Sequence, residues 1–413
     1  MADPTFSRAR IIFVNRFYWP EEPATAQLLT DLAEALAGAG HRVTVIASHS
    51  GRPELPRTDV RNGVEIKRVR GTRWATAGAL GKAIDFLTFY LGAFETLLFT
   101  ATKGDAVIVL TDPPLIGVGA WLAARMRGAR IFHWVQDIYP EIAMELTGHR
   151  WLGLTRPLRN AAWRNADGCV VLGADMKALL VENGTPASRI TISPNWAPAG
   201  LGRSEQSAAG PLRAEWNLAG QFVVAYSGNL GRVHDLEPVI ELAAALRDEP
   251  KISFLFIGGG AQRDRLQSLA AARQLTRVQF RPSQPRERLD ETLALGDVHL
   301  VTLLPGCERL VFPSKLYGVT AAGRPVIFIG PRNSELAREI ERGGFGHAFE
   351  RGEIERMAAT IRALSRDASA VDRLARASLA FAPSHLGPTR AVGEWETLLG
   401  SGTAARPRLP QSA

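Results

Sequence analysis

Two short segments in the second half of the sequence combine glycines with cations in a way that suits a phosphate ligand. The first, AYSGNLGRVHDLE, contains Gly228, Asn229, Gly231 and Arg232 directly after an apolar run. We expect this turn to end a strand and to precede a helix, so that free backbone NH groups and the helix dipole attract an anion. Arg232 adds a full charge, and the segment therefore predicts a diphosphate site. The alternative is an ordinary tight turn.

The second segment, FPSKLYG, places Ser314 and Lys315 after Pro313, a residue typical of helix starts. Departure of a nucleoside diphosphate develops negative charge on the leaving oxygen, and fixed cations can stabilise that charge without a metal. We therefore predict that Arg232 and Lys315 are catalytic, that Ser314 contacts the substrate and that no metal or other cofactor is needed. The alternative for Lys315 is a solvated side chain at a helix start.

The apolar pattern predicts the elements that must position these residues. Runs rich in Val, Ile and Phe alternate with Ala/Leu-rich stretches of helical period, which indicates an α/β fold with parallel sheets covered by helices. In the first half we predict strands near 11–15, 42–47, 64–69, 106–110, 131–135 and 169–172. In the second half the predicted strands are FVVAYSG, ISFLFIGGG, RVQFRP, DVHLVTL and RPVIFIG.

The length of 413 residues exceeds a single ordinary domain, and a stretch rich in Pro, Gly and Ser after Ser193 has the composition of a linker. We predict two Rossmann-like, doubly wound domains that face a central cleft, with bounds 1–195 and 196–384. A crossover helix is expected over 385–400 and a disordered tail over 401–413.

Composition narrows the partners and the compartment. Lys and Arg outnumber Asp and Glu by 49 to 41, which favours anionic ligands, but the basic residues form no run, so nucleic acid is not expected as a partner. The two cysteines, Cys169 and Cys307, lie far apart without metal-type spacing. The N-terminus lacks the features of a signal peptide. Together these features predict a cytoplasmic protein.

The segment at 83–101, AIDFLTFYLGAFETLLFTA, is apolar nearly all round, with only Asp85 and Glu95 charged. It falls short of the roughly 20 uninterrupted apolar residues that span a bilayer. One interpretation is a buried helix between two strands. The other is a helix lying in a membrane interface, with nearby basic residues facing an acidic leaflet. The residues expected to insert in that case are Trp74, Phe86, Phe89, Tyr90 and Phe94, and the basic residues are Arg68, Arg70, Arg73 and Lys82.

Seven motifs in order resemble the bacterial retaining glycosyltransferases of family four, which have the GT-B fold, and in particular the colanic-acid and O-antigen type with its fucosamine-transferase-like branch. They are RIIFVNRFYWPEEPATAQLLTDLAEALAGAGHRVTVIAS, TDPPLIGVGAWLAA, FHWVQDIYPE, ITISPNW, AYSGNLGRVHDLE, FIGGGAQRDRL and FPSKLYGVTAAGRPVIF. The likeness extends from about residue 10 to residue 400. One departure is the missing EX7E pattern, because Gly318 stands where the second Glu usually occurs.

The resemblance implies a nucleotide-sugar donor, with a UDP-sugar favoured, held by the second domain. Gly259 and Pro282 lie at the ends of two further predicted strands, where backbone groups in relatives cradle the base and ribose. The alternative for both is an ordinary loop at a strand end. Because the Glu of relatives that contacts the donor is absent, the identity of the sugar does not carry over.

The resemblance also implies that the first domain binds the acceptor, a lipid-linked or free glycan of a bacterial surface polysaccharide, at the inner-membrane surface. Asp137 is the leading candidate to contact the acceptor hydroxyl or the donor sugar, whereas strand alternation predicts a buried, structural His133. Glu21 and Thr25, together with Glu22, lie in the loop after the first strand, which faces the substrates in the family. An N-cap role for Thr25 is the alternative.

Other functions of the same architecture remain open from the sequence. A nucleotide-sugar 2-epimerase shares the twin-domain plan, and a non-catalytic lipid-surface protein would share the apolar segment. A dinucleotide-dependent oxidoreductase is disfavoured because no GxGxxG follows the first strand. For transfer with retention, we expect a same-face attack in which the leaving phosphate takes the acceptor proton, with no nucleophilic carboxylate.

Overall fold

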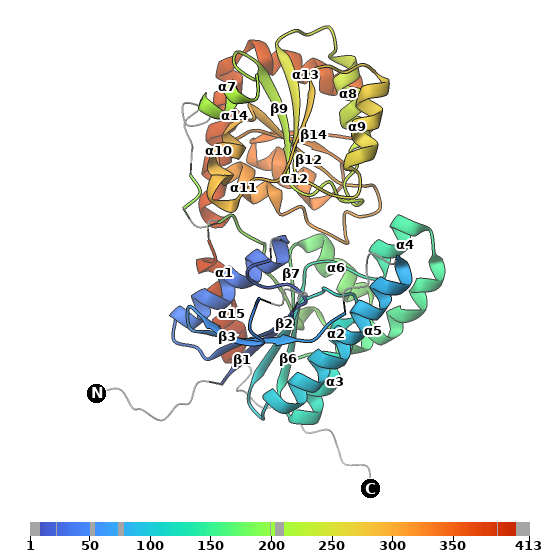
Figure 1. Cartoon of the computed structure of the whole chain (residues 1–413), viewed down its shortest axis with the longest axis vertical. Coiled ribbons are helices and arrows are strands. Elements are labelled where there is room, and N and C mark those ends of the chain that lie inside the picture. Colours follow the sequence, from blue (N-terminus) through green and yellow to red (C-terminus); the bar gives the residue numbers. More distant parts are fainter. Residues whose placement is uncertain are drawn as a thin grey trace, which may run out of the picture. The chain divides into compact units, whose positions relative to one another are not determined.

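The computed structural model describes residues 9–21, 23–49, 54–72, 78–198, 200–202, 210–385 and 387–401. The chain forms two compact units, each built on its own sheet (Figure 1). One unit comprises Met1–Pro140, Trp151–Pro194 and Pro388–Ala413, and the other comprises Glu141–Arg150 and Asn195–Gly387. The disordered tail predicted from the sequence lies, from residue 402 onward, outside the described residues.

The N-terminal unit contains an eight-stranded sheet in the order β3-β4-β2-β1-β5-β6-β7-β8. All neighbours are parallel except β3 and β4. The strands are β1 Ile11–Val14, β2 Val43–Ser48, β3 Thr58–Arg61, β4 Val64–Val69, β5 Ala106–Val109, β6 Arg130–Val135, β7 Gly168–Val171 and β8 Ile190–Ile192. The order reverses between β1 and β5, and ligands of such sheets bind beyond the carboxyl ends of the strands at that point.

Helices connect these strands, and the last helix of the chain also belongs to this unit. The helices are α1 Ala24–Gly38, α2 Ala79–Thr100, α3 Ile116–Arg127, α5 Arg156–Arg164, α6 Ala174–Glu182 and α15 Thr389–Ser401, with 3-10 turns η2 Arg150–Thr155 and η3 Ala187–Arg189. Trp395 of α15 packs edge-on against Trp134 of β6 with ring centroids 5.9 Å apart. Arg130 Nη1 donates to the Leu399 carbonyl at 2.6 Å, so α15 is tied to the sheet.

The C-terminal unit contains a six-stranded, wholly parallel sheet in the order β11-β10-β9-β12-β13-β14. The strands are β9 Phe222–Ser227, β10 Ile252–Ile257, β11 Val278–Arg281, β12 Val298–Thr302, β13 Val326–Ile329 and β14 Gly346–Phe349. The helices are α4 Glu141–Thr147, α7 Gly210–Glu215, α8 Glu237–Ala245, α9 Arg263–Ala272, α10 Leu289–Ala294, α11 Lys315–Ala321, α12 Glu335–Gly343, α13 Ile354–Arg366 and α14 Ala368–Phe381, with η5 Arg286–Arg288 and η6 Ala382–His385. Its order reverses between β9 and β12, as in a Rossmann fold.

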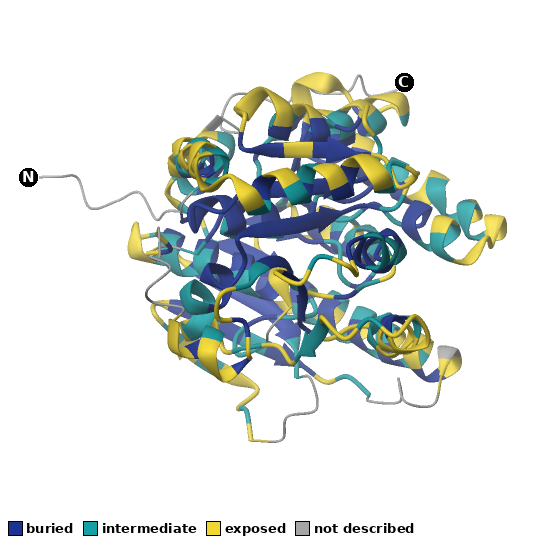
Figure 2. Ribbon diagram, turned by 90° about the horizontal axis from the view of Figure 1, so that it is seen from above, coloured by how far each residue is buried: buried dark blue, intermediate teal, exposed yellow. Residues whose placement is uncertain are grey.

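The central strands are buried and the outer faces of the helices are exposed, as Figure 2 shows in dark blue and yellow. The strands β1, β5, β7, β10, β12 and β13 have every residue buried. Continuous apolar runs of this kind arise because helices cover both faces of a parallel sheet. The α/β fold predicted from the apolar pattern is therefore confirmed.

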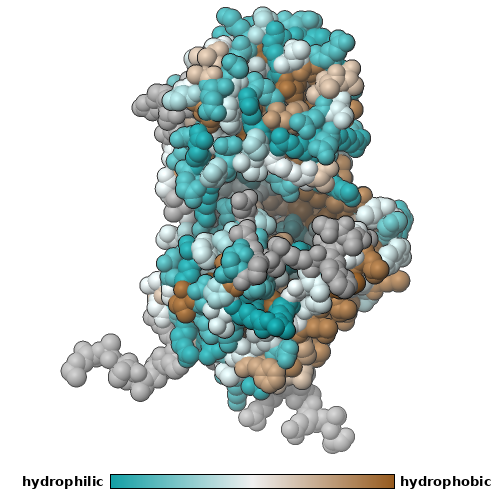
Figure 3. Space-filling model, viewed as in Figure 1, coloured by the Kyte–Doolittle hydropathy of each residue, from teal (hydrophilic) through white to brown (hydrophobic). Residues whose placement is uncertain are grey.

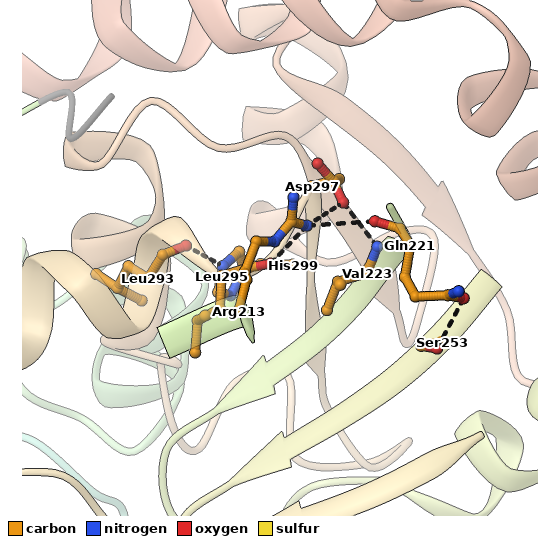
Figure 4. Close-up of polar contacts among 8 residues, drawn as sticks. All are labelled: Arg213, Gln221, Val223, Ser253, Leu293, Leu295, Asp297 and His299. Atoms are coloured by element: carbon orange, nitrogen blue, oxygen red, sulfur yellow. Dashed lines mark hydrogen bonds and ion pairs between the residues drawn. The ribbon is translucent and has the colours of Figure 1, made fainter. Parts of the chain in front are cut away.

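Beside the first residues of β9 and β12, a partly buried ion pair joins α7 to the sheet (Figure 4). Arg213 Nη2 lies 2.6 Å from Asp297 Oδ2, and the same oxygen accepts a hydrogen bond from the Val223 NH at 2.7 Å. Removing one partner of such a pair leaves an uncompensated charge and destabilises the unit. Because the ion pair lies at the amino ends of the strands, away from the ligand-binding edge, we assign it to structure.

Three strands were not predicted from the sequence, namely β3, β8 and β14. β3 is a short antiparallel edge strand whose residues are exposed or half-buried, and so it lacks an apolar run. The linker expected after Ser193 is wrong at its start, because Trp196 and Ala197 are 4% and 1% exposed. The Ala197 NH donates to the His385 carbonyl at 2.8 Å, which fixes this stretch against η6.

Candidate functional site

In the C-terminal unit, the loops that follow β9 and β10 pack backbone against backbone. The NH of Gly228 donates to the Ile257 carbonyl at 2.9 Å, and the NH of Leu230 donates to Gly259 at 2.7 Å. A Cβ at Gly258 would lie 2.1 Å from the Gly228 oxygen, and Gly258 has a φ of +139°. Only glycine permits this approach. The loops are therefore set by contacts between main chains at the carboxyl ends of β9 and β10, next to the point where the strand order reverses.

The Lys315 side chain reaches the same place from the first turn of α11. Its Nζ lies 3.5 Å from the centroid of the Tyr226 ring, and a Cβ at Gly228 would lie 3.5 Å from that Nζ. The Lys315 Nζ is buried and has no hydrogen-bond partner among the residues that the structure describes. Burial lowers the pKa of Lys315 well below its ordinary value. A buried ammonium without a partner fits a position where an anion binds.

His234 completes this cluster from the loop between β9 and α8. Its Nδ1 lies 2.8 Å from the Thr302 carbonyl, and its ring meets Tyr226 edge-on at 6.0 Å. Burial, with the nearby Lys315 charge, lowers the pKa of His234 to about 3. The imidazole is therefore neutral at pH 7, and the Thr302 carbonyl selects the tautomer with the proton on Nδ1.

The other residues predicted for the donor lie at the same edge of this unit. Arg232 is exposed and Ser314 is half-buried, and Ser314 precedes α11 without a side-chain capping bond. Gly259 and Pro282 are exposed beyond β10 and β11. One detail of the prediction is wrong, since α8 begins only at Glu237 and the glycine turn does not open a helix directly.

In the N-terminal unit, polar side chains follow β1, β5 and β6. The Arg16 NH donates to the Asp112 carbonyl at 2.9 Å, which joins the two loops where the order reverses. The Asp137 NH donates to Thr111 Oγ1 at 3.1 Å. Asp112 and Asp137 are both half-buried, and each lies after the end of its strand. The fold thus brings together two carboxyl groups that stand apart in the sequence.

The carboxyl groups of Asp112 and Asp137 interact electrostatically. Burial raises the pKa of Asp112 to about 6, against the opposing charges of Arg16 and Lys82. Burial, with the negative charge of Asp112, raises the pKa of Asp137 to about 7. Two coupled acids titrate as a pair, so near neutral pH the pair exchanges a proton easily. Such a pair can accept a hydrogen bond from a hydroxyl group.

Asp137 lines a pocket with His133, Tyr139 and Arg159. His133 is 4% exposed, which confirms its predicted burial, and burial lowers its pKa to about 4. Its Nε2 has no hydrogen-bond partner among the described residues. Arg159 donates to the Tyr139 carbonyl at 2.7 Å and stacks over Trp163 at 4.2 Å. The pocket is therefore polar at Thr111, His133, Asp137 and Arg159, and aliphatic and aromatic groups form the rest of its lining.

The loop after β1 differs from the prediction for Thr25. Thr25 is the second residue of α1, whose N-cap is Pro23 with no side-chain capping bond, so the alternative N-cap role is wrong. Glu21 is half-buried, and its NH donates to the Tyr18 carbonyl at 2.9 Å. Glu22 lies outside the described residues.

Sequence reasoning missed four residues of these two clusters, namely Arg16, Asp112, Tyr226 and His234. Each occupies the end of a predicted strand or the loop after it, which was the available signal. Whether these residues come together depends on which strands are neighbours in the sheet. β1 and β5 are neighbours in the sheet but far apart in the sequence, and no sequence pattern indicates their pairing.

Solved structures share this architecture over nearly the whole chain. HepE of Anabaena, crystallised with UDP-glucose, has a TM-score of 0.74 at 15% identity, covering 95% of this chain and 99% of that one. The sucrose-phosphate synthase of Thermosynechococcus elongatus has a TM-score of 0.79 at 16% identity, covering 97% and 100%. Two Rossmann-like units of this kind define the GT-B class of glycosyltransferases, and the fold of this protein is GT-B.

Sequence comparison then identifies the family. Residues 25–196 match the glycosyl transferase 4-like domain, and residues 211–379 match the glycosyl transferases group 1 domain. WcaI of Escherichia coli (strain K12), assigned to colanic acid biosynthesis as a glycosyl transferase, is 28% identical over 372 residues, which cover 86% of this chain and 91% of WcaI. WbjE of Pseudomonas aeruginosa, assigned as a glycosyltransferase, is 31% identical over 272 residues, covering 61% and 66%. The chain belongs to the family-four glycosyltransferases, and the resemblance seen in the sequence is confirmed.

Proposed function

We propose that this protein transfers a sugar from a nucleotide-sugar donor, a UDP-sugar, to a lipid-linked or free glycan acceptor in bacterial surface-polysaccharide synthesis, with retention of configuration and without a metal. The C-terminal unit holds the donor and the N-terminal unit holds the acceptor. HepE, which shares the fold, was crystallised with UDP and with UDP-glucose, and WcaI is assigned to colanic acid biosynthesis. These relatives support the proposed class of donor and of product.

The observation that carries the proposal is the buried, unpartnered ammonium of Lys315 beside the Gly228 backbone. Burying a charge is costly unless a counter-charge and hydrogen bonds compensate it. A donor diphosphate at this place would supply both, and exposed Arg232 would add a second cation from the same loop. Fixed cations of this kind act where negative charge develops as the diphosphate leaves.

The proposed reaction needs no protein nucleophile. The acceptor hydroxyl oxygen forms a bond to the anomeric carbon while the bond from that carbon to the diphosphate oxygen breaks. The hydroxyl proton passes to the departing diphosphate on the same face, which retains the configuration. Asp137 orients the acceptor hydroxyl by accepting its hydrogen bond, and Lys315 and Arg232 stabilise the leaving group.

A donor panel tests this proposal. Calorimetry with UDP, GDP and their sugar conjugates measures affinity, and product analysis with and without acceptor separates transfer from epimerisation. We expect UDP binding, transfer that continues in a chelator, and a product anomer that NMR shows to match the donor. Absence of any affinity for these nucleotides would overturn the proposal. Release of UDP with an unsaturated sugar from donor alone would favour the 2-epimerase instead.

We further propose that the N-terminal unit contacts an anionic membrane surface through α2, α3 and η2–α5. Among the described residues, all exposed large hydrophobic side chains except Val60 and Val181 come from these elements. They are Leu80, Leu87, Leu91, Phe99, Leu122, Met126, Trp151, Leu154 and Leu158. Figure 3 shows brown atoms gathered over this flank. Exposed Lys82, Arg125 and Arg127 on the same elements suit acidic lipids.

The helix α2 has one buried face and one exposed apolar face. It therefore fits neither a wholly buried helix nor a helix that lies only in a membrane interface, the two interpretations made from the sequence. Phe89, Ala93 and Leu97 are each 1% exposed, whereas Leu91 and Phe99 are 62% and 82% exposed. By length and composition, Leu80–Thr100 is the one described helix that could cross a membrane, with mean hydropathy 1.3 and 28% of its 18-residue apolar window buried in the protein. The buried face supports a docked helix rather than a spanning one.

This structure also corrects the residues expected to insert. Phe89 is buried, Arg68 is 5% exposed and donates to the Pro56 carbonyl at 2.9 Å, and Trp74 and Arg73 lie outside the described residues.

Co-sedimentation with phosphatidylglycerol-containing vesicles tests the proposed membrane-contacting surface. We expect the double variant Leu87→Glu, Leu91→Glu to lose binding at least tenfold, whereas the control Val181→Glu retains it. Equal sedimentation of both variants would contradict the proposed surface.

A further inference from the structure

An apolar pocket lies between α2 and α3, beside the carboxyl end of β1. Its cavity volume is about 210 Å³. It is lined by Val14, Tyr90, Ala93, Phe94, Leu97, Leu115, Ile116, Val118, Gly119, Ala120 and Leu158. Tyr90 is the one polar side chain in this lining, and its hydroxyl donates to the Pro114 carbonyl. Concave sites with a mostly apolar lining accept apolar ligands.

This pocket adjoins the Asp137 pocket. Leu115, Ile116 and Val118 line both. Leu115 has a φ of +68°, in the left-handed region that bulky side chains avoid. Strained residues persist where the surroundings hold them, and they gather at ligand sites. The wall between the apolar and the polar pocket is thus held in an unfavourable backbone conformation.

Charged side chains lie near Tyr90, the polar residue of the apolar pocket. The charges of Asp112 and Arg16 both act on the Tyr90 hydroxyl, and Lys82 acts on Asp112. The guanidinium of Arg16 lies 5.1 Å from the centre of the Phe86 ring, one turn before Tyr90 on α2. An elongated apolar group in the pocket would therefore have an anionic head within reach of two cations.

We infer that the pocket between α2 and α3 binds the hydrocarbon chain of a phosphate-headed acceptor lipid, whose head and sugar then lie toward Arg16 and Asp137. This inference rests on the proposed function, of which it specifies the acceptor. Three features support this occupant: an apolar lining, an adjoining pocket that contains Asp137, and the cations Arg16 and Lys82 beside Phe86 on α2. Leu158, 53% exposed at the rim, belongs to the same exposed apolar flank, from which a chain could enter.

Gly119 offers a way to fill the pocket without disturbing the fold. It lines the pocket, and a Cβ built there meets no atom within 4 Å. Replacing a glycine inside a helix also favours the helix by up to about 1 kcal/mol for alanine. Gly393 of α15 is the matched control, because a Cβ there also meets nothing within 4 Å and the site is exposed.

Calorimetry of the full chain with farnesyl phosphate, with UDP present to occupy the donor site, tests the inference. We expect Gly119→Leu to weaken farnesyl phosphate binding at least tenfold and Gly119→Ala by a smaller factor, with Gly393→Leu within twofold of the original protein. Inorganic phosphate should bind far more weakly. Dodecyl phosphate provides a second arm: weaker binding than farnesyl phosphate identifies a branched isoprenoid chain, and tighter binding identifies a straight acyl chain.

Two results would overturn the chain site. One is equal farnesyl phosphate affinity in Gly119→Leu and the original protein at unchanged Tm. The other is affinity for inorganic phosphate equal to that for farnesyl phosphate. If the chain site is wrong, nucleotide binding and transfer to a water-soluble acceptor should still be measurable. If the proposed function is wrong, both of these activities should be absent even when farnesyl phosphate binds in the pocket.

Discussion

The ammonium nitrogen of Lys315 lies 3.5 Å from the centre of the Tyr226 ring, and no described residue accepts a hydrogen bond from it. A desolvated cation over an aromatic ring gains about 2 kcal/mol. The penalty for taking an ion out of water is several kcal/mol even after relaxation. The ring alone therefore does not compensate the charge, and a bound anion would stabilise the folded C-terminal unit as well as occupy it.

Replacing Lys315 by methionine should lower turnover and raise stability together. Loss of about 3–4 kcal/mol of charge stabilisation in the transition state corresponds to a fall of two to three decades in kcat. The same change removes a buried, unpartnered charge, so Tm without ligand should rise by a few degrees. Steady-state kinetics and a thermal melt measure the two effects.

The control for that variant is Lys103→Met, at an exposed lysine of the N-terminal unit, which should leave both quantities unchanged. UDP should raise the Tm of the original protein and have little effect on Lys315→Met. A variant that loses both stability and activity would indicate a structural lysine instead.

Arg232 differs from Lys315 because its side chain is exposed. Its replacement by alanine should leave Tm within about a degree, since surface substitutions usually change stability by less than about 0.5 kcal/mol. Turnover should still fall by about two to three decades if Arg232 contacts the leaving diphosphate. Arg247→Ala, at an exposed arginine whose Nε donates to the Ala244 carbonyl, is the control. A loss below threefold in both Arg232→Ala and Lys315→Met would refute the assignment of these cations.

Neighbouring glycines of the β10 loop should respond in opposite ways to alanine. At Gly258 a Cβ would lie 2.1 Å from the Gly228 oxygen, so we expect Gly258→Ala to lower stability by about 3 kcal/mol or more. At Gly259 a Cβ meets no protein atom within 4 Å, so Tm should be unchanged. If the donor base or ribose lies against Gly259, calorimetry should nevertheless show weaker UDP binding to Gly259→Ala. Unchanged UDP affinity would remove Gly259 from the site.

The sequence was sufficient to predict the doubly wound plan because parallel strands covered on both faces are continuously apolar. It also located Lys315 at the start of a helix and Gly228 directly after a strand, since proline and glycine have local conformational causes. The strands it missed, such as β3, have half-exposed edges without that apolar signature.

The contacts of the site were not predictable in the same way. Asp112 stood as a single carboxylate in the sequence, and its influence on Asp137 depends on β5 and β6 being neighbours. The ring of Tyr226 was assigned only to a strand, although its face is what Lys315 contacts. Such pairs depend on strand order and on side-chain direction at the strand ends, and neither has a local sequence pattern.

Asp137 gives a prediction whose sign follows from its pKa. Its folded-state pKa of about 7 lies above the ordinary value of 3.8, so the folded protein holds this proton more tightly than the unfolded chain. Stability is therefore lost as pH rises from about 4 to about 7. Asp137→Asn carries no such charge. The difference in Tm between this variant and the original protein should be near zero at pH 4, and at pH 8 the variant should have the higher Tm.

Catalytic activity should depend on the same ionisation of Asp137, but it should increase with pH where stability decreases. If the charged carboxylate orients the acceptor hydroxyl, kcat/KM should rise about tenfold per pH unit below pH 7 and level off above it. Asp137→Asn should lower kcat/KM and flatten this profile. Asp112→Asn removes the neighbouring negative charge, so the inflection should move to lower pH while activity persists. An unchanged profile in Asp137→Asn would show that another group, such as the leaving diphosphate, sets the pH dependence and that Asp137 does not orient the acceptor through its charge.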